Sequence, residues 1–63
     1  MDIDGLKQNY REQIVKAQGA RTGVGYAKAL GITESRLSNL RNGQLYGFSL
    51  ESLMQLAARA NSL

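Results

Sequence analysis

Two short amphipathic segments separated by a glycine constrain the fold of this chain more than any other feature. They lie within residues 22–43, at about residues 23–30 and 34–41. Thr33 stands directly before the second segment, where a threonine oxygen accepts a hydrogen bond from a free backbone N–H of the first helical turn. Gly31 follows the first segment, where a left-handed backbone conformation often ends a helix. The pattern predicts a helix, a tight turn and a second helix.

The apolar residues of this motif repeat at helical spacing. Leu37 and Leu40 form an inward stripe on the second helix, and Ala27 and Leu30 are expected to point inward from the first. Ile32 precedes the cap of the second helix and can pack back against Leu37 as a hydrophobic staple. The first helix, with Thr22 as its cap, contains Gly23 and Gly25, which are poor helix formers. We therefore expect its stability to depend on tertiary packing.

A longer helix is predicted before the motif, over residues 3–17. Its apolar residues fall on one helical face: Leu6, Tyr10, Ile14 and Ala17. Asp2 or Asp4 is expected to cap its start, where a negative charge also suits the positive end of the helix dipole. Gly19 is expected to end it.

Another helix is predicted over residues 50–60, after a loop at residues 44–48. Ser49 is its expected cap, and its apolar face is formed by Leu50, Leu53, Leu56, Ala57 and Ala60. No window shows sustained alternation of apolar and polar residues, so the fold class is all-α. We expect a single domain over residues 1–63, a compact bundle of four helices, with a fifth helix as the alternative.

Composition excludes several classes of protein. A chain of 63 residues is near the lower limit for independent folding. It has no cysteine and no histidine, so disulfides are excluded and the usual zinc ligands are absent. We also find no close acidic pair beyond Asp2 and Asp4 and no phosphate-binding loop, and therefore predict no enzymatic activity, no metal and no cofactor. No apolar run approaches the roughly 18 residues of a membrane span.

Positive charge is concentrated in the middle of the chain. Residues 16–41 contain five basic side chains and one acidic side chain, namely Lys16, Arg21, Lys28, Arg36 and Arg41 against Glu34. This region therefore carries a net charge of five minus one, or +4. Such a field attracts phosphate and makes binding salt-dependent. The alternative is an ordinary solvated surface.

The motif resembles the lambda-repressor/Cro-like helix-turn-helix family. The resemblance rests on the framework Ala27, Leu30-Gly31-Ile32-Thr33, Ser35, Leu37, Ser38, Leu40 and Asn42-Gly43. Residues 48–53, followed by Leu56 and Ala57, are also similar to the small phage-type and antitoxin-type members. Many members carry glutamine where this chain has Gly23, so only a backbone N–H is left there. Tyr26 stands where an aliphatic residue is usual, and we expect its ring in the core with the hydroxyl at the rim.

The resemblance implies that the second motif helix enters the major groove of DNA. The expected DNA-binding residues are Gly23, Thr33, Glu34, Ser35, Arg36, Ser38, Asn39, Arg41, Asn42 and Gln44. Glu34 could accept from cytosine, Asn39 could pair with adenine, and Arg36 is the strongest candidate for guanine or phosphate. Asn42 and Gln44 are expected to hold the adjacent strand. Each of these side chains could instead be a plain solvated surface residue.

The family resemblance implies a sequence-specific regulator of transcription, most simply a repressor that binds a pseudo-palindromic operator as a homodimer. The alternative is an antitoxin-like module that neutralises a toxin partner and represses its own operon. Either protein is expected in the cytoplasm of a bacterial or phage-infected cell, at the nucleoid. Four apolar side chains off the main stripes could be core edge or a self-association patch: Val15, Leu45, Tyr46 and Met54. Tyr10 and Phe48 are expected in the core.

Overall fold

The computed structural model describes residues 2–63 and contains four helices. These are α1 (Ile3–Ala17), α2 (Gly23–Leu30), α3 (Glu34–Arg41) and α4 (Leu50–Asn61). No strand occurs between residues 2 and 63, so the all-α, four-helix prediction is confirmed and the five-helix alternative is wrong for this part of the chain. The first three helices have the predicted bounds, whereas α4 continues one residue past Ala60.

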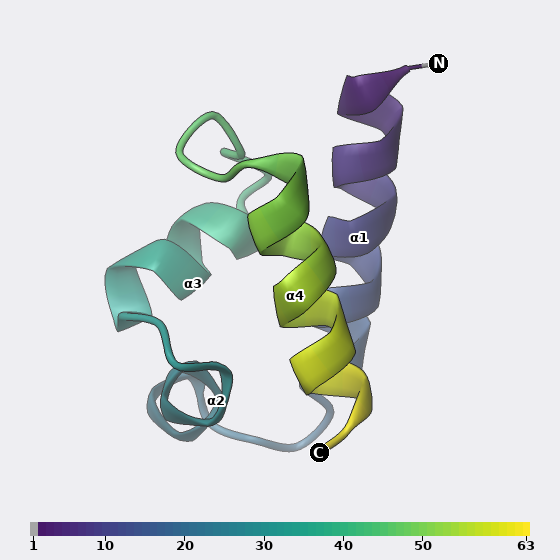
Figure 1. Ribbon diagram of the computed structural model, residues 1–63. Helices are drawn as coiled ribbons and strands as arrows, with labels where there is room; N and C mark the ends of the chain where they lie inside the picture. The colour runs from purple at the N-terminus through teal and green to yellow at the C-terminus, as the bar shows by residue number, and fades with distance from the viewer. Residues whose placement is uncertain (1) are drawn as a thin grey trace.

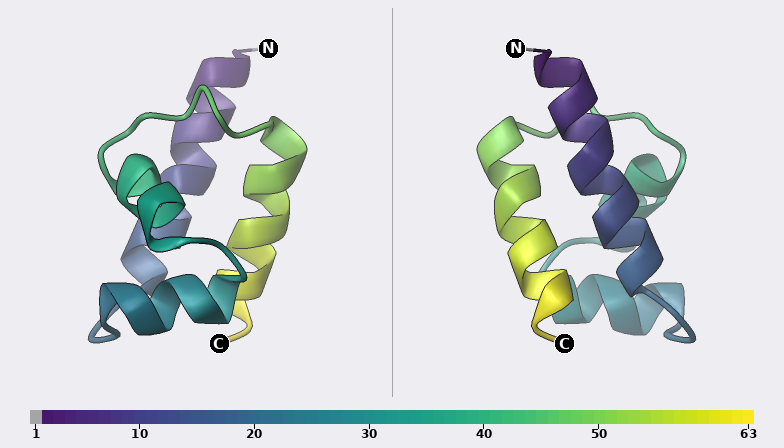
Figure 2. Two further views of the ribbon diagram at one scale, coloured as in Figure 1. Left: turned by 90° about the vertical axis from the view of Figure 1, so that its left-hand side faces the viewer. Right: turned by 90° about the vertical axis from the view of Figure 1, so that its right-hand side faces the viewer.

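The two longer helices form the support for the two shorter ones. α1 and α4 lie side by side and run in the same direction, and α1 packs mainly against α4 (Figure 1). α2 lies across the end of this pair that is near the C-terminus, and α3 lies farther along the same side (Figure 2). The helix-turn-helix pair is thus held on one side of α1 and α4. None of the helices within residues 2–63 is long and apolar enough to cross a membrane.

One hydrophobic core joins all four helices and the loop before α4. Its buried members are Ile14, Tyr26, Ala27, Leu30, Leu37, Leu40, Leu45, Phe48, Leu53, Leu56, Ala57 and Ala60. The predicted inward residues of the motif are therefore confirmed, as are Phe48 and the partly buried Tyr10. Of the residues outside the apolar stripes, Leu45 belongs to the core, but Tyr46 is 91% exposed and Met54 is 47% exposed.

Three of the predicted caps form as expected. The hydroxyls of Thr22, Thr33 and Ser49 each accept a hydrogen bond of 3.1 Å from a backbone N–H three residues later. The cap of α1 differs, because Asp2 occupies the capping position but its side chain accepts no capping hydrogen bond. Asp4 lies inside the first turn, where its charge favours the helix dipole. A side-chain cap on α1 was therefore a wrong prediction.

Both helices of the motif end at a glycine with a left-handed backbone. Gly31 has a φ of 75°, and the Ile32 N–H donates to the carbonyl of Ala27 at 3.0 Å. Gly43 has a φ of 80° after α3, and the Gln44 N–H donates to the carbonyl of Asn39. Only glycine adopts this conformation without steric cost. The two glycines therefore fix where α2 and α3 stop.

Tyr26 corrects one prediction about the core. Its side chain is fully buried, and its hydroxyl donates to the carbonyl of Ile14 rather than lying at the rim. That carbonyl lacks its usual helical partner, because the Gln18 N–H bonds to Val15 instead. Burial raises the pKa of Tyr26 above its ordinary 10.0, with a smaller opposing effect from the positive charge of Arg21.

Candidate nucleic-acid interface

α3 contributes few side chains to the core and leaves most of its surface exposed. Only Leu37 and Leu40 are buried. The other side chains of the helix are polar or charged and all are exposed: Glu34, Ser35, Arg36, Ser38, Asn39 and Arg41. Because only two leucines of α3 are buried in the core, the polar side chains of the helix are accessible from outside.

The exposed surface of α3 has a centre and two flanks. With 3.6 residues per turn, Ser35 and Asn39 lie opposite the buried leucines. Glu34 and Arg41 lie on the flank that faces α2, where both line a pocket. Arg36 lies on the opposite flank, which faces α4. Glu34, which was expected to accept from cytosine, therefore lies at the edge of this surface rather than at its centre.

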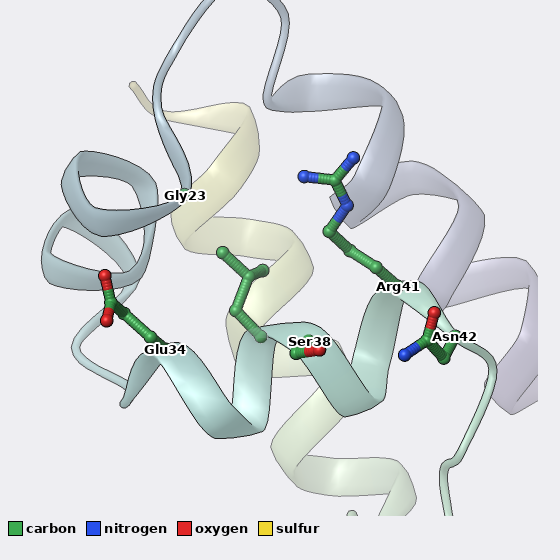
Figure 3. Close-up of a pocket in the computed structure, with 6 residues that line it drawn as sticks. Gly23, Glu34, Ser38, Arg41 and Asn42 are labelled. Atoms are coloured by element: carbon green, nitrogen blue, oxygen red, sulfur yellow. The ribbon is translucent and has the colours of Figure 1, made fainter.

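A pocket of about 250 Å³ lies between the start of α2 and α3. It is lined by Gly23, Glu34, Leu37, Ser38, Arg41 and Asn42. Five of the residues predicted to bind DNA therefore surround one hollow, and Figure 3 shows them along α3 with Gly23 at the start of α2. Within residues 2–63, no atom outside the local chain lies within 4 Å of a Cβ placed at Gly23, so α2 begins beside open space.

The start of α2 supplies positive partial charge to this pocket. The first N–H groups of a helix have no intrahelical acceptor, and the helix dipole makes this end positive. The hydroxyl of Thr22 accepts from the Gly25 N–H, which leaves the N–H groups of Gly23 and Val24 facing outward from the helix end. The pocket thus combines these N–H groups and the guanidinium of Arg41, which attract an anion such as a DNA phosphate, with the carboxylate of Glu34, which opposes one.

Arg36 was expected to be the strongest candidate for a guanine or phosphate contact, but its side chain contacts the loop before α4. Its guanidinium carbon stands 4.5 Å from the centre of the Phe48 ring, a cation–π contact. Its Nη2 donates to the carbonyl of Gly47 at 3.4 Å. The side chain is thus turned from α3 toward the loop before α4. It remains exposed, so it can still meet a phosphate beside that loop.

The remaining predicted residues lie at the ends of α3. Thr33 lines a second pocket of about 370 Å³ with Arg36, on the side of α4. Its hydroxyl oxygen already caps α3 through the Arg36 N–H. Asn42 and Gln44 are exposed at the other end of the helix. All ten predicted DNA-binding residues are therefore exposed around α3 and the start of α2, but their contacts with DNA stay a prediction.

Two arginines outside the motif hold it in place, and sequence reasoning missed both. Arg11 of α1 donates from Nε to the carbonyl of Leu40 at 2.8 Å and from Nη2 to that of Arg41. Arg59 of α4 donates from Nη1 to the carbonyl of Leu30 at 2.9 Å. Each arginine thus satisfies carbonyls at the negative end of a motif helix. The sequence placed Arg11 on a polar helix face and Arg59 in the last turn of its own helix, where the helix dipole favours a positive charge.

The comparisons with known proteins agree with this geometry. A family model described as a helix-turn-helix domain matches residues 22–62, which include α2, α3 and α4. No curated protein and no solved structure matched the chain. The match covers most of the chain and is consistent with the Cro-like resemblance of the motif. The chain therefore belongs to the helix-turn-helix domain family.

Proposed function

We propose that this protein is a sequence-specific regulator of transcription that binds double-stranded DNA through α3, acting as a repressor on a pseudo-palindromic operator. The observation that carries the proposal is that α3 buries only Leu37 and Leu40 and exposes every other side chain. A helix held in this way can enter the major groove without loss of core contacts. The family match supports the same assignment.

In this proposal the exposed residues have two roles. Ser35 and Asn39, opposite the buried leucines, are the residues that reach base edges when α3 lies in the groove. Asparagine pairs with adenine through two hydrogen bonds, so Asn39 is the main specificity residue in this proposal. Arg41 and the start of α2 lie beside the helix, where phosphates pass, and they position the domain without reading sequence.

A homodimer completes the proposal. Two copies related by a twofold axis place their recognition helices about 34 Å apart, one turn of DNA, and the operator then repeats each half-site. A domain of 63 residues gives a single recognition helix and a small interface, so two copies gain affinity by binding together. Sedimentation of the protein with and without a duplex carrying two half-sites measures this directly.

Selection of bound duplexes from a random DNA pool tests the proposed function. We expect an enriched half-site and an affinity that falls steeply with salt. Asn39→Ala should relax the preference at one base pair, costing about 5- to 150-fold on the selected sequence while leaving random DNA unchanged. Gln13→Ala, an exposed change on α1, is the control. Failure to enrich any sequence, with equal affinity for random and selected duplexes, would contradict sequence-specific binding.

Exposed apolar side chains favour a second candidate, an antitoxin-like module with a toxin partner. Tyr46 is 91% exposed in the loop before α4, and aromatic side chains are enriched in protein interfaces. Purification of the protein from its native cells, followed by identification of a stoichiometric protein partner, distinguishes this candidate. Tyr46→Ser should abolish binding of that partner and leave the DNA sequence selected by the protein unchanged.

A further inference from the structure

Gln18 is a polar residue whose side chain is buried, although it does not belong to the exposed surface of α3. It lies at the C-terminal end of α1 and is 8% exposed. Among residues 2–63 it is the only buried polar or charged residue, tyrosine being grouped with the hydrophobic residues. A buried amide is costly unless its donor and acceptor are both satisfied. The hydrogen-bond partners of the Gln18 amide therefore decide whether its burial is costly.

Both ends of the Gln18 amide are satisfied, each by a different segment. Its Nε2 donates to the backbone carbonyl of Arg21 at 2.8 Å, in the connection between α1 and α2. Its Oε1 accepts from Nη1 of Arg41 at 3.0 Å, at the end of α3. A carbonyl can only accept and a guanidinium can only donate, so one orientation of the amide satisfies both. Gln18 thus joins α1, the connection to α2 and α3.

The hydrogen bond from Arg41 fixes where its guanidinium stands. Arg41 is exposed and lines the pocket between α3 and the start of α2. In Figure 3 the guanidinium of Arg41 extends from the end of α3 and the carboxylate of Glu34 from its start, both toward the side where Gly23 lies. A guanidinium carries five N–H donors, and within residues 2–63 only Nη1 of Arg41 is hydrogen-bonded. The remaining donors are available to an anion in the pocket.

We propose that Gln18 is a positioning residue for DNA binding, which holds the guanidinium of Arg41 beside the start of α2 so that both meet one backbone phosphate. The inference rests on the proposed function. Gly23 has no side chain to reach that phosphate, and the space beside it is open. A freely rotating arginine loses side-chain entropy when it binds, whereas Arg41 is already oriented. Gln18 itself touches no DNA and acts only through Arg41.

A double-mutant cycle on DNA affinity tests this inference. The four proteins are the wild type, Gln18→Met, Arg41→Met and the double variant, titrated with a selected duplex at several salt concentrations. Arg41→Met should lower the affinity and reduce the salt slope by about one phosphate contact. Gln18→Met should lower the affinity by about five- to tenfold. In the Arg41→Met background, Gln18→Met should have no further effect, because the residue it positions is gone.

Two further variants separate positioning from folding. Gln13→Met makes the same change at an exposed site on α1 and should leave the affinity unchanged. Gln18→Glu keeps an acceptor for Arg41 but neutralises its charge, so the salt slope should fall as in Arg41→Met. Urea unfolding verifies that each protein is folded at the temperature of the titration.

The outcomes are distinct. If Gln18→Met weakens binding equally with and without Arg41, the positioning role is wrong and Gln18 supports only the fold. A wild-type salt slope in Gln18→Glu and in Arg41→Met also overturns it, since Arg41 then meets no phosphate. If the wild-type protein binds no duplex, the proposed function fails before the cycle is begun.

Discussion

At the scale of single residues, two buried polar groups connect parts of the chain that the hydrophobic core alone would leave loosely oriented. Tyr26 joins α2 to the last turn of α1 through the carbonyl of Ile14. Gln18 joins the end of α1 to the end of α3 through Arg41. Because a polar group in a low-dielectric interior must find its partner, such contacts specify one packing arrangement among several apolar alternatives.

Tyr26→Phe tests the first of these contacts. The change keeps the ring in the core but leaves the buried Ile14 carbonyl without the hydroxyl donor. We expect a loss of about 1–3 kcal/mol in the free energy of unfolding, measured by urea denaturation. Tyr10→Phe, at a partly buried position, is the control and should cost less. Equal stability of Tyr26→Phe and wild type would show that the buried hydrogen bond contributes nothing.

The raised pKa of Tyr26 predicts a loss of stability in alkali. The folded state keeps its proton to a higher pH than the unfolded state, whose tyrosine titrates near 10.0. Above that pH the unfolded state binds fewer protons, so the free energy of unfolding decreases as pH rises. The contribution is fully present below pH 10 and is lost as pH passes the folded-state pKa. Tyr26→Phe should show a shallower decline above pH 10 in parallel urea titrations.

At the scale of helices, the C-terminal ends of α2 and α3 share one arrangement. Each end has a glycine with a left-handed backbone and accepts hydrogen bonds from an arginine of another helix. Gly31 ends α2 and Gly43 ends α3, each with a positive φ. Arg59 and Arg11 then donate to carbonyls at those same two ends, from α4 and α1 respectively. The angle between α2 and α3 is therefore set by the local turn and by the two outer helices together.

Gly31→Ala should destabilise the domain because its backbone is left-handed. The φ of 75° costs an alanine about 1–2 kcal/mol, and the new Cβ would stand 3.3 Å from Nη1 of Arg59. Gly23→Ala is the matched control, since its backbone is helical and the space around it is open. That control should gain about 0.5–1 kcal/mol in urea unfolding. Opposite signs for the two substitutions are the expected result, and a shared sign contradicts the turn geometry.

Arg11→Met should release the end of α3 while keeping the aliphatic stem of the side chain. Both hydrogen bonds from Arg11 come from a charged donor, so we expect a loss of about 1.5–3 kcal/mol. Lys16→Met removes an exposed positive charge from the same helix and should change stability little. Thermal unfolding followed by circular dichroism compares the two. A loss of similar size in both variants would assign the effect to net charge.

The sequence predicted local features well and remote contacts poorly. Thr22, Thr33, Ser49, Gly31 and Gly43 act within a few residues of themselves, so their effect on helix ends is readable from sequence. The contact between Gln18 and Arg41 and the hydrogen bonds of Arg11, Arg59 and Arg36 join residues that are 11 to 30 positions apart. They depend on how helices pack, which no local pattern gives. The ten predicted DNA-binding residues are all exposed, but Glu34 and Arg36 lie on opposite flanks of α3 and not at the centre of its exposed surface.

At the scale of the whole molecule, a small core supports a large polar recognition surface. In the described part of the chain, twelve buried hydrophobic residues from the four helices and the loop before α4 form the core. A domain of this size has a free energy of unfolding of about 3–9 kcal/mol. The loss of one large core side chain is therefore comparable with the total stability.

Leu53→Ala should demonstrate this narrow margin. Leu53 is fully buried in α4, and its truncation to alanine costs about 2–5 kcal/mol. We expect a partly or largely unfolded protein at 25 °C, seen as a loss of helical circular dichroism. Met54→Ala alters the next residue, which is 47% exposed, and should remain folded. A folded Leu53→Ala variant with wild-type melting would contradict a core shared by all four helices.

The central claim is that α3 and the start of α2 form the surface that binds DNA. Amide chemical-shift mapping of the ¹⁵N-labelled protein, titrated with a selected duplex, tests it most directly. We predict the largest shifts at Ser35, Asn39 and Gly23 and in the side-chain signals of Arg41, with little change along the outer surfaces of α1 and α4. Shifts concentrated on α1 and α4, with α3 unchanged, would contradict the claim.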